Sequence, residues 1–153
     1  IPPGDETSIV HGDFRLDNIM YHATEPRVLA VLDWELSTLG HPLADFAYHV
    51  MTWYIPQPFR GLYGVDLAEL GIPDVERYVA KYCERTGRDP IDPDHWDFYI
   101  AYNMFRLCGI LQGIMGRVKA GTAASKKAEA MARGARPLAE LGWVQVEKIL
   151  ARQ

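Results

Sequence analysis

The sequence has few cysteines and no long apolar run, and both absences narrow the class of protein. Its two cysteines, Cys83 and Cys108, lie in helix-like apolar patterns without metal-ligand spacing, so we expect small buried side chains rather than a disulfide or a metal site. No stretch approaches the roughly 18 uncharged apolar residues that span a bilayer. Residues 1–5 lack the basic-then-apolar order of a signal peptide. We therefore expect a cytoplasmic protein without a membrane partner.

The sequence also lacks an excess of positive charge. It carries 16 lysines and arginines against 20 aspartates and glutamates, a net charge of -4. Domains that bind nucleic acid through its phosphates normally carry a basic stripe, so we expect no nucleic-acid partner. An anionic substrate stays open, because a magnesium ion and a few well-placed cations can supply positive charge locally.

What is present is an ordinary globular composition. The 153 residues are 48% hydrophobic and 24% charged, which is enough for one domain with a core. The residues that suggest chemistry begin within a dozen positions of the first residue, which is not a methionine. We therefore expect the chain to be part of a longer protein.

The first third of the chain is β-like and the rest is helical. Short apolar runs at 18–21 and 28–32 flank a polar stretch with a proline, which is typical of a hairpin. Asp92-Pro93 gives an N-cap followed by proline, the clearest helix start in the chain. The helices that apolar spacing predicts cover about 43–54, 74–85, 92–114, 123–133 and 137–152. We expect an α+β fold, mainly α-helical, with one small hairpin.

The polar loop before the hairpin carries the residues that suggest catalysis. His11, Asp13 and Asn18 have the spacing His-x-Asp-x-x-x-x-Asn of a kinase catalytic loop. In that loop the aspartate accepts the proton of the substrate hydroxyl and the asparagine holds a magnesium ion. Asp33 ends the following apolar strand, where kinases place a second magnesium ligand. A hairpin can hold these oxygens around one small volume, where magnesium relieves the repulsion between carboxylates.

The same residues also have a purely structural explanation. Asp13, Asn18 and Asp33 could be turn formers that satisfy their own backbone. A histidine beside a buried aspartate, as His11 would be, is more often a hydrogen-bonded brace than a proton carrier. The order of loop, strand, polar hairpin and aspartate-terminated strand favours the catalytic interpretation.

The chain resembles the phosphotransferase enzyme family of aminoglycoside, choline and homoserine kinases in three motifs. These are HGDFRLDN at 11–18, LDWE at 32–35 and GHPLAD at 40–45. The segment 103–113 is similar to the branch related to kinase domains fused to acyl-CoA dehydrogenases. The resemblance implies that 1–153 form the C-terminal lobe of a protein-kinase-like fold, whose hairpin carries the catalytic and metal-binding loops.

The resemblance also implies an activity and a role for each motif residue. The activity is ATP-dependent transfer of the γ-phosphate to a hydroxyl of a small molecule, with ATP and Mg2+ as cofactors. Asp13 would be the catalytic base, and Asn18 and Asp33 the ligands of the magnesium and hence of the nucleotide. Arg15 stands where many protein kinases have a lysine that faces the transferred phosphate.

Two further residues would have structural tasks near the site: His11 as a brace of the loop, and Asp45 as a carboxylate that accepts hydrogen bonds from the loop backbone. No glycine-rich loop and no strand-borne lysine precede His11 in this sequence. The resemblance therefore implies that the N-terminal nucleotide-binding lobe of the same protein is a partner, and that the chain alone is inactive.

Two other interpretations stay open. The chain could be a kinase-like module that binds a partner or ligand without catalysis. It could also be a metal-dependent hydrolase with His11, Asp13 and Asp33 as ligands, although such sites usually need further histidines at close spacing.

The helices contain one isolated charge and many aromatic residues. Arg106 lies in a segment that is apolar nearly all round, so we expect it to have a carboxylate partner or a ligand. Aromatic residues at helical spacing are usually core, but one or two could line a substrate pocket. The aromatic candidates are Trp53, Tyr54, Phe59, Trp96 and Tyr99. This region is aromatic rather than acidic, which disfavours a polycationic aminoglycoside as substrate.

Overall fold

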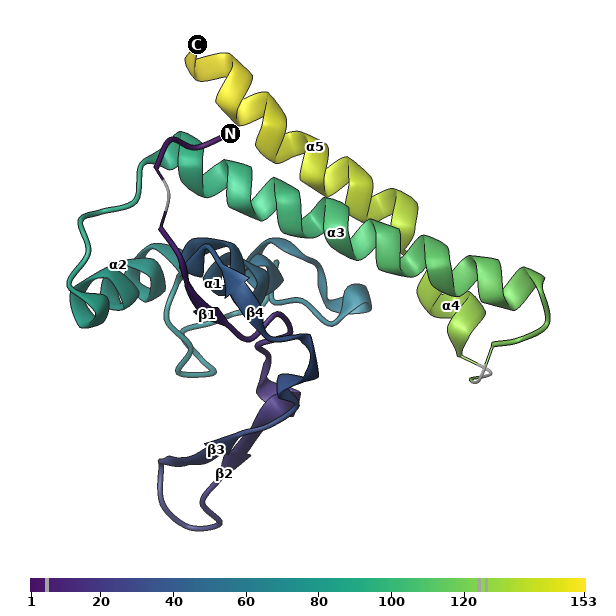
Figure 1. Cartoon of the computed structure of the whole chain (residues 1–153), viewed down its shortest axis with the longest axis horizontal. Coiled ribbons are helices and arrows are strands. Elements are labelled where there is room, and N and C mark those ends of the chain that lie inside the picture. The colour runs from purple at the N-terminus through teal and green to yellow at the C-terminus, as the bar shows by residue number, and fades with distance from the viewer. Residues whose placement is uncertain (5, 124, 126) are drawn as a thin grey trace.

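The computed structural model describes residues 1–4, 6–123, 125 and 127–153, and it is mainly helical with two small antiparallel sheets (Figure 1). The predicted α+β class is therefore confirmed. Among the described residues, none of the helices combines the length and the hydropathy that crossing a membrane requires.

Each sheet is a pair of short strands. In the first, β1 (Ser8–Val10) pairs with β4 (Thr38–Gly40). In the second, β2 (Ile19–Tyr21) pairs with β3 (Val28–Val31), with Ile19 opposite Val31. The second pair is the predicted hairpin, and Figure 1 shows it projecting from the helices. Strand β4 was not predicted, because a three-residue strand owes its existence to its partner rather than to its own sequence.

The helices follow the predicted order. They are α1 (Pro42–Val50), α2 (Val75–Thr86), α3 (Pro93–Lys119), α4 (Ala128–Ala132) and α5 (Ala135–Arg152). Short 3-10 turns lie at Leu16–Asn18, Trp34–Leu36, Met51–Tyr54 and Gln57–Phe59. The turn Met51–Tyr54 directly continues α1, so the predicted helix 43–54 is present with its last turn tightened.

The predicted caps account for several helix ends. Asp92 Oδ1 accepts hydrogen bonds from the amides of Asp94 at 2.9 Å and His95 at 3.2 Å, which begins α3. Asp74 caps α2 in the same way, and Gly87, with a φ of 68°, ends it.

Two of the predicted helix boundaries were wrong. Helix α3 continues to Lys119, five residues beyond the predicted stripe, and ends before Gly121 with its φ of 70°. The helix predicted at 123–133 covers only Ala128–Ala132, and two of its predicted residues, 124 and 126, lie outside the described residues.

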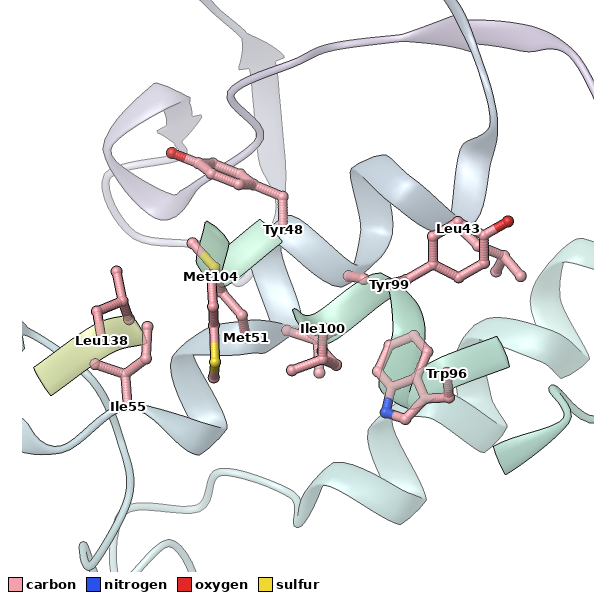
Figure 2. Close-up of a cluster of buried hydrophobic side chains, with 11 residues drawn as sticks. Leu43, Tyr48, Met51, Ile55, Trp96, Tyr99, Ile100, Met104 and Leu138 are labelled. Carbon is pink, nitrogen blue, oxygen red and sulfur yellow. The ribbon is translucent and has the colours of Figure 1, made fainter. Parts of the chain in front are cut away.

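The core lies between α1, α3 and α5. Figure 2 shows Met51, Ile100, Met104 and Leu138 meeting there. Helices α3 and α5 lie side by side (Figure 1). They approach closely at Gly142, where an added Cβ would lie only 3.3 Å from the Met104 Cβ.

Most of the aromatic residues predicted as possible pocket residues belong to this core or pack against it. Trp96 and Tyr99 are buried, and Trp53 and Tyr54 are half-buried against the same cluster. The Trp96 indole donates a hydrogen bond to the Tyr54 hydroxyl at 3.0 Å. Phe59 is 40% exposed.

Candidate active site

A carboxylate of α1 holds the start of the polar loop. The backbone amides of His11 and Gly12 donate to the two oxygens of Asp45, at 2.8 and 2.9 Å. Asp45 lies in the first turn of α1, which proline at position 42 begins. Hydrogen bonds to an ionised acceptor are roughly twice as strong as neutral ones, so this contact fixes the loop on the helix.

His11 connects the loop to the end of β3. Its ring is buried, with 3% exposure. The Asp13 amide can only donate, so Nδ1 accepts from it at 3.2 Å; the Leu32 carbonyl can only accept, so Nε2 donates to it at 2.8 Å. These partners require the tautomer with its proton on Nε2. Both ring nitrogens are occupied by backbone groups, which is the geometry of a brace.

Asp13 and Asn18 lie at the two ends of the same loop and are in contact. The Asn18 side-chain nitrogen donates to the Asp13 carbonyl at 2.9 Å and lies 3.3 Å from Asp13 Oδ2. With the nitrogen turned toward Asp13, the Asn18 side-chain oxygen is left for another partner. A side-chain oxygen is the kind of ligand that a hard cation prefers.

Asp33 is held next to this loop through its neighbour Leu32. The Leu32 amide donates to the Asn18 carbonyl at 2.8 Å, and the Leu32 carbonyl accepts from His11. Asp33 itself has a left-handed backbone, with φ 65° and ψ 52°, which is uncommon outside glycine. Its side chain is exposed, and in the described parts of the chain its carboxylate forms no hydrogen bond or ion pair. The structure thus brings Asp13, Asn18 and Asp33 to one end of the hairpin.

Arg15 points along the loop toward a carboxylate. Its guanidinium forms an ion pair with Asp17, and both side chains are largely exposed. This hydrogen bond is the main reason why the pKa of Arg15 is raised, and the charge of Asp13 acts in the same direction. The same contact lowers the pKa of Asp17.

Tyr48, which the sequence did not identify as a site residue, lies beside Asp13. It is on the last turn of α1 and only 8% exposed, and in Figure 2 its hydroxyl points away from the core toward the purple N-terminal segment. Burial is the main cause of its raised pKa, and the neighbouring Asp13 carboxylate is the next. Nothing in the sequence distinguished Tyr48 from the other aromatic residues of the helices.

Of the two partners expected for Arg106, a carboxylate or a ligand, the described residues supply no carboxylate. Its guanidinium donates to the Gly12 carbonyl at 2.5 Å and lies over the Tyr48 ring, 4.7 Å from its centroid. A backbone carbonyl and an aromatic face satisfy this charge. The isolated arginine was the right signal for a special contact, but a sequence cannot show a backbone partner 94 residues away.

The donor set fits a magnesium ion that is shared with phosphates. Asn18 and Asp33 offer oxygen atoms, and magnesium is usually held by one or two carboxylates together with substrate phosphates and water. Among the described residues, no group of three or more histidine, cysteine, aspartate or glutamate side chains is arranged to hold a metal by itself. The residues therefore fit magnesium brought with a nucleotide better than a closed protein metal site.

A cavity of about 500 Å3 lies elsewhere on the chain. Its lining includes His41, Arg88, Asp92 and Tyr99, and none of the candidate catalytic or metal-binding residues.

Comparison with known proteins agrees with this geometry. The sequence pattern of the phosphotransferase enzyme family matches residues 1–99. The crystal structure of a proposed aminoglycoside phosphotransferase from Ralstonia eutropha JMP134 is similar with a TM-score of 0.85 and 61% identity, over 93% of this chain and 43% of that one.

Curated proteins are also similar to this chain in sequence. Acyl-CoA dehydrogenase family member 10 of Mus musculus is 47% identical over 146 residues, which cover 94% of this chain and 14% of that protein. Acyl-CoA dehydrogenase family member 11 of Homo sapiens is 41% identical over 147 residues, covering 93% of this chain and 18% of that protein.

A helical lobe with a hairpin-borne loop of this kind is the architecture of the C-terminal lobe in the protein-kinase-like fold. The chain belongs to the phosphotransferase enzyme family. Its fold matches the C-terminal lobe of the protein-kinase-like fold, as the motifs predicted. The chain spans less than a fifth of the length of these curated relatives and 43% of the solved chain.

Proposed function

We propose that this chain is the catalytic lobe of an ATP-dependent kinase that transfers the γ-phosphate to a hydroxyl of a small molecule. The observation that carries the proposal is the position of Leu32, bonded through its amide to Asn18 and through its carbonyl to His11. This clamp keeps Asp33 beside the loop of Asp13 and Asn18. Phosphoryl transfer depends mainly on such positioning and on charge stabilisation.

Each side chain has a definite task in this proposal. Asp13 orients the attacking hydroxyl and accepts its proton. Asn18 and Asp33 hold a magnesium ion, which when bound supplies positive charge to the phosphates of ATP. Arg15 faces the transferred phosphate, and to do so its guanidinium exchanges the Asp17 carboxylate for phosphate oxygens.

The nucleotide requires a second part of the protein. Kinases cover the phosphates with a glycine-rich loop and grip them with a lysine paired to a glutamate. The ten residues before His11 supply neither, so we propose that a nucleotide-binding lobe of the same protein completes the site. The chain alone is then inactive.

The charges around Asp13 affect which class of acceptor molecule the site can bind. Arg15 is close enough for the charge of Asp13 to act on it, and Arg106 contacts the residue before Asp13. A polycationic acceptor needs a pocket rich in carboxylates, so these arginines disfavour an aminoglycoside. Choline, homoserine and hydroxyacyl thioesters stay in the candidate set.

The direct test uses the parent protein that contains this chain. ADP release from Mg·ATP is measured with a panel of hydroxyl compounds: choline, homoserine, an aminoglycoside and a hydroxyacyl thioester. Asp13→Ala should lower the stimulated rate by about 10²–10⁴-fold, the usual contribution of a general base, with an unchanged unfolding midpoint. Glu140→Ala, which removes an exposed carboxylate paired with Arg136 on α5, should leave the rate unchanged. Undiminished turnover in Asp13→Ala would refute the proposal.

The two alternatives make different predictions. A hydrolase with His11 as metal ligand loses support, because both ring nitrogens already bond to backbone groups. A non-catalytic binding module would bind Mg·ATP in calorimetric titration of the parent protein and show no turnover with any compound of the panel.

A further inference from the structure

We propose that Arg106 is a positioning residue of the catalytic loop, which sets the direction of Asp13 by holding the peptide group that precedes it. The inference rests on the proposed function, because it takes Asp13 as the base. Arg106 lies on α3, and 94 residues separate it from the carbonyl that it contacts.

The peptide group between Gly12 and Asp13 is held at both of its polar ends. The Gly12 carbonyl accepts from Arg106 at 2.5 Å, and the Asp13 amide donates to His11 Nδ1 at 3.2 Å. Rotation of this peptide plane would turn the Cα–Cβ bond of Asp13 and move its carboxylate. With both ends occupied, the plane has one orientation.

Arg106 is itself held in place by Tyr48. The guanidinium lies over the Tyr48 ring, 4.7 Å from the centroid, and the Tyr48 hydroxyl lies beside the Asp13 carboxylate. One aromatic side chain thus lies under the arginine. Burial raises its pKa, and it is close enough to the base for the charge of Asp13 to raise the pKa further. Tyr48 is three residues after Asp45, so both lie on the same face of α1, toward the loop.

The two helices that contribute these contacts are tied together close to the loop. Asn103, one turn before Arg106 on α3, donates to the Ala44 carbonyl of α1 at 2.9 Å. Asp45 follows Ala44 and holds the amides of His11 and Gly12. The loop is therefore held from α1 through its amides and from α3 through a carbonyl, and the Asn103–Ala44 hydrogen bond joins the two helices.

Because Arg106 orients the peptide group before Asp13, its removal should affect the catalytic rate and not only the stability of the fold. A purely structural arginine would lower the unfolding midpoint when removed and leave the chemistry of the folded molecules intact. A positioning arginine lowers kcat in molecules that are still folded, because a misplacement of about 1 Å can cost about 10²-fold in rate. The affinity for ATP should hardly change, since the contacts of Leu32, and not Arg106, tie the proposed magnesium ligands Asn18 and Asp33 together.

The experiment compares three variants of the parent protein. Arg106→Met removes the donor, Arg106→Lys keeps a charged donor, and Arg117→Met is the matched control, an exposed arginine in the last turn of α3. Initial rates of ADP release from Mg·ATP are measured with the most active compound of the panel, or with water as acceptor, together with hydrogen exchange of the loop amides.

We expect Arg106→Met to lower kcat by about 10- to 100-fold, with KM for ATP changed less than about twofold. Exchange at His11 and Gly12 should become faster. Arg106→Lys should recover most of the rate, and Arg117→Met should behave as wild type. If Arg106→Met does not fold, Arg106→Gln, which keeps a polar head but is too short for the contact, replaces it with the same expected loss.

Two results would overturn the inference: a normal kcat in Arg106→Met when Asp13→Ala is inactive, or no recovery in Arg106→Lys. Failure of the proposed function gives a different pattern. Asp13→Ala would then keep full turnover, while faster exchange at His11 and Gly12 in Arg106→Met would still show that Arg106 holds the loop.

Discussion

Gly12 packs so closely against Leu36 that a Cβ at position 12 would lie 2.5 Å from the Leu36 carbonyl oxygen. Gly12 also has a φ of 82°, which side chains rarely tolerate. The loop that carries Asp13 therefore lies directly against the turn that follows Asp33. This contact, together with the Leu32 clamp, holds the loop that contains Asp13 against the segment that contains Asp33.

Gly12→Ala should destabilise the chain by at least about 3 kcal/mol, because backbone strain and a clash with backbone act together. Gly64→Ala is the matched control: it has a φ of 80° and nothing within 4 Å of the added Cβ. It should cost only about 1–2 kcal/mol from the left-handed backbone. Urea unfolding measures the loss of stability in both variants. Equal losses would show that the backbone at Leu36 moves aside at little energetic cost.

Asp45→Asn should destabilise the chain by about 2 kcal/mol, the value of a hydrogen bond to a charged group. The two Asp45 oxygens each accept one amide, and asparagine has only one oxygen. At Asp92 a single oxygen accepts both amides of the α3 N-terminus, so Asp92→Asn can keep both bonds and should be nearly neutral. Chemical unfolding of the two variants compares them, and a neutral Asp45→Asn would contradict the assignment.

His49 should make the stability of the chain depend on pH. Burial lowers its pKa below the ordinary value of 6.5, and its neighbours are Phe14, Trp53 and the Tyr78 hydroxyl at 3.0 Å. Below pH 6.5 the unfolded chain binds a proton at this site that the folded chain does not, so stability falls as the pH falls through this window and is complete above it.

The measurement is the free energy of unfolding between pH 8 and pH 5 for the wild type and for His49→Gln, whose amide can still bond to Tyr78. The variant should be less stable at pH 8 but should lose less stability on acidification. Parallel curves for the two proteins would show that His49 does not titrate differently on folding.

The sequence predicted those features that depend on local chemistry. The Asp92-Pro93 start of α3 was visible because N-caps and first-turn prolines act on their own helix. The hairpin was visible from two apolar runs around a polar connection. The chemical roles that the spacing indicates for Asp13 and Asn18 stay a prediction.

The features that the sequence could not predict depend on contacts between distant segments. Strand β4 exists because β1 pairs with it. Arg106 contacts a carbonyl, and every residue has one, so no side-chain pattern marks the partner. The tautomer of His11 follows from its contact with the Leu32 carbonyl, and no sequence pattern marks that carbonyl as a partner either.

Magnesium should bind to the parent protein together with ATP and hardly at all without it. In the proposed site Asn18 and Asp33 supply two ligands, so phosphate oxygens and water must supply the rest. Calorimetric titration with Mg2+ alone should give no saturable signal at millimolar concentration, whereas titration with Mg·ATP should.

Asp33→Asn should weaken Mg·ATP binding by at least about tenfold, because it removes the charged ligand. Glu25→Gln, which changes an exposed carboxylate between β2 and β3 that is paired with Arg27, should bind Mg·ATP like wild type. Tight binding of a metal ion without nucleotide would instead require a protein ligand set beyond these two residues, and would return the hydrolase interpretation to consideration.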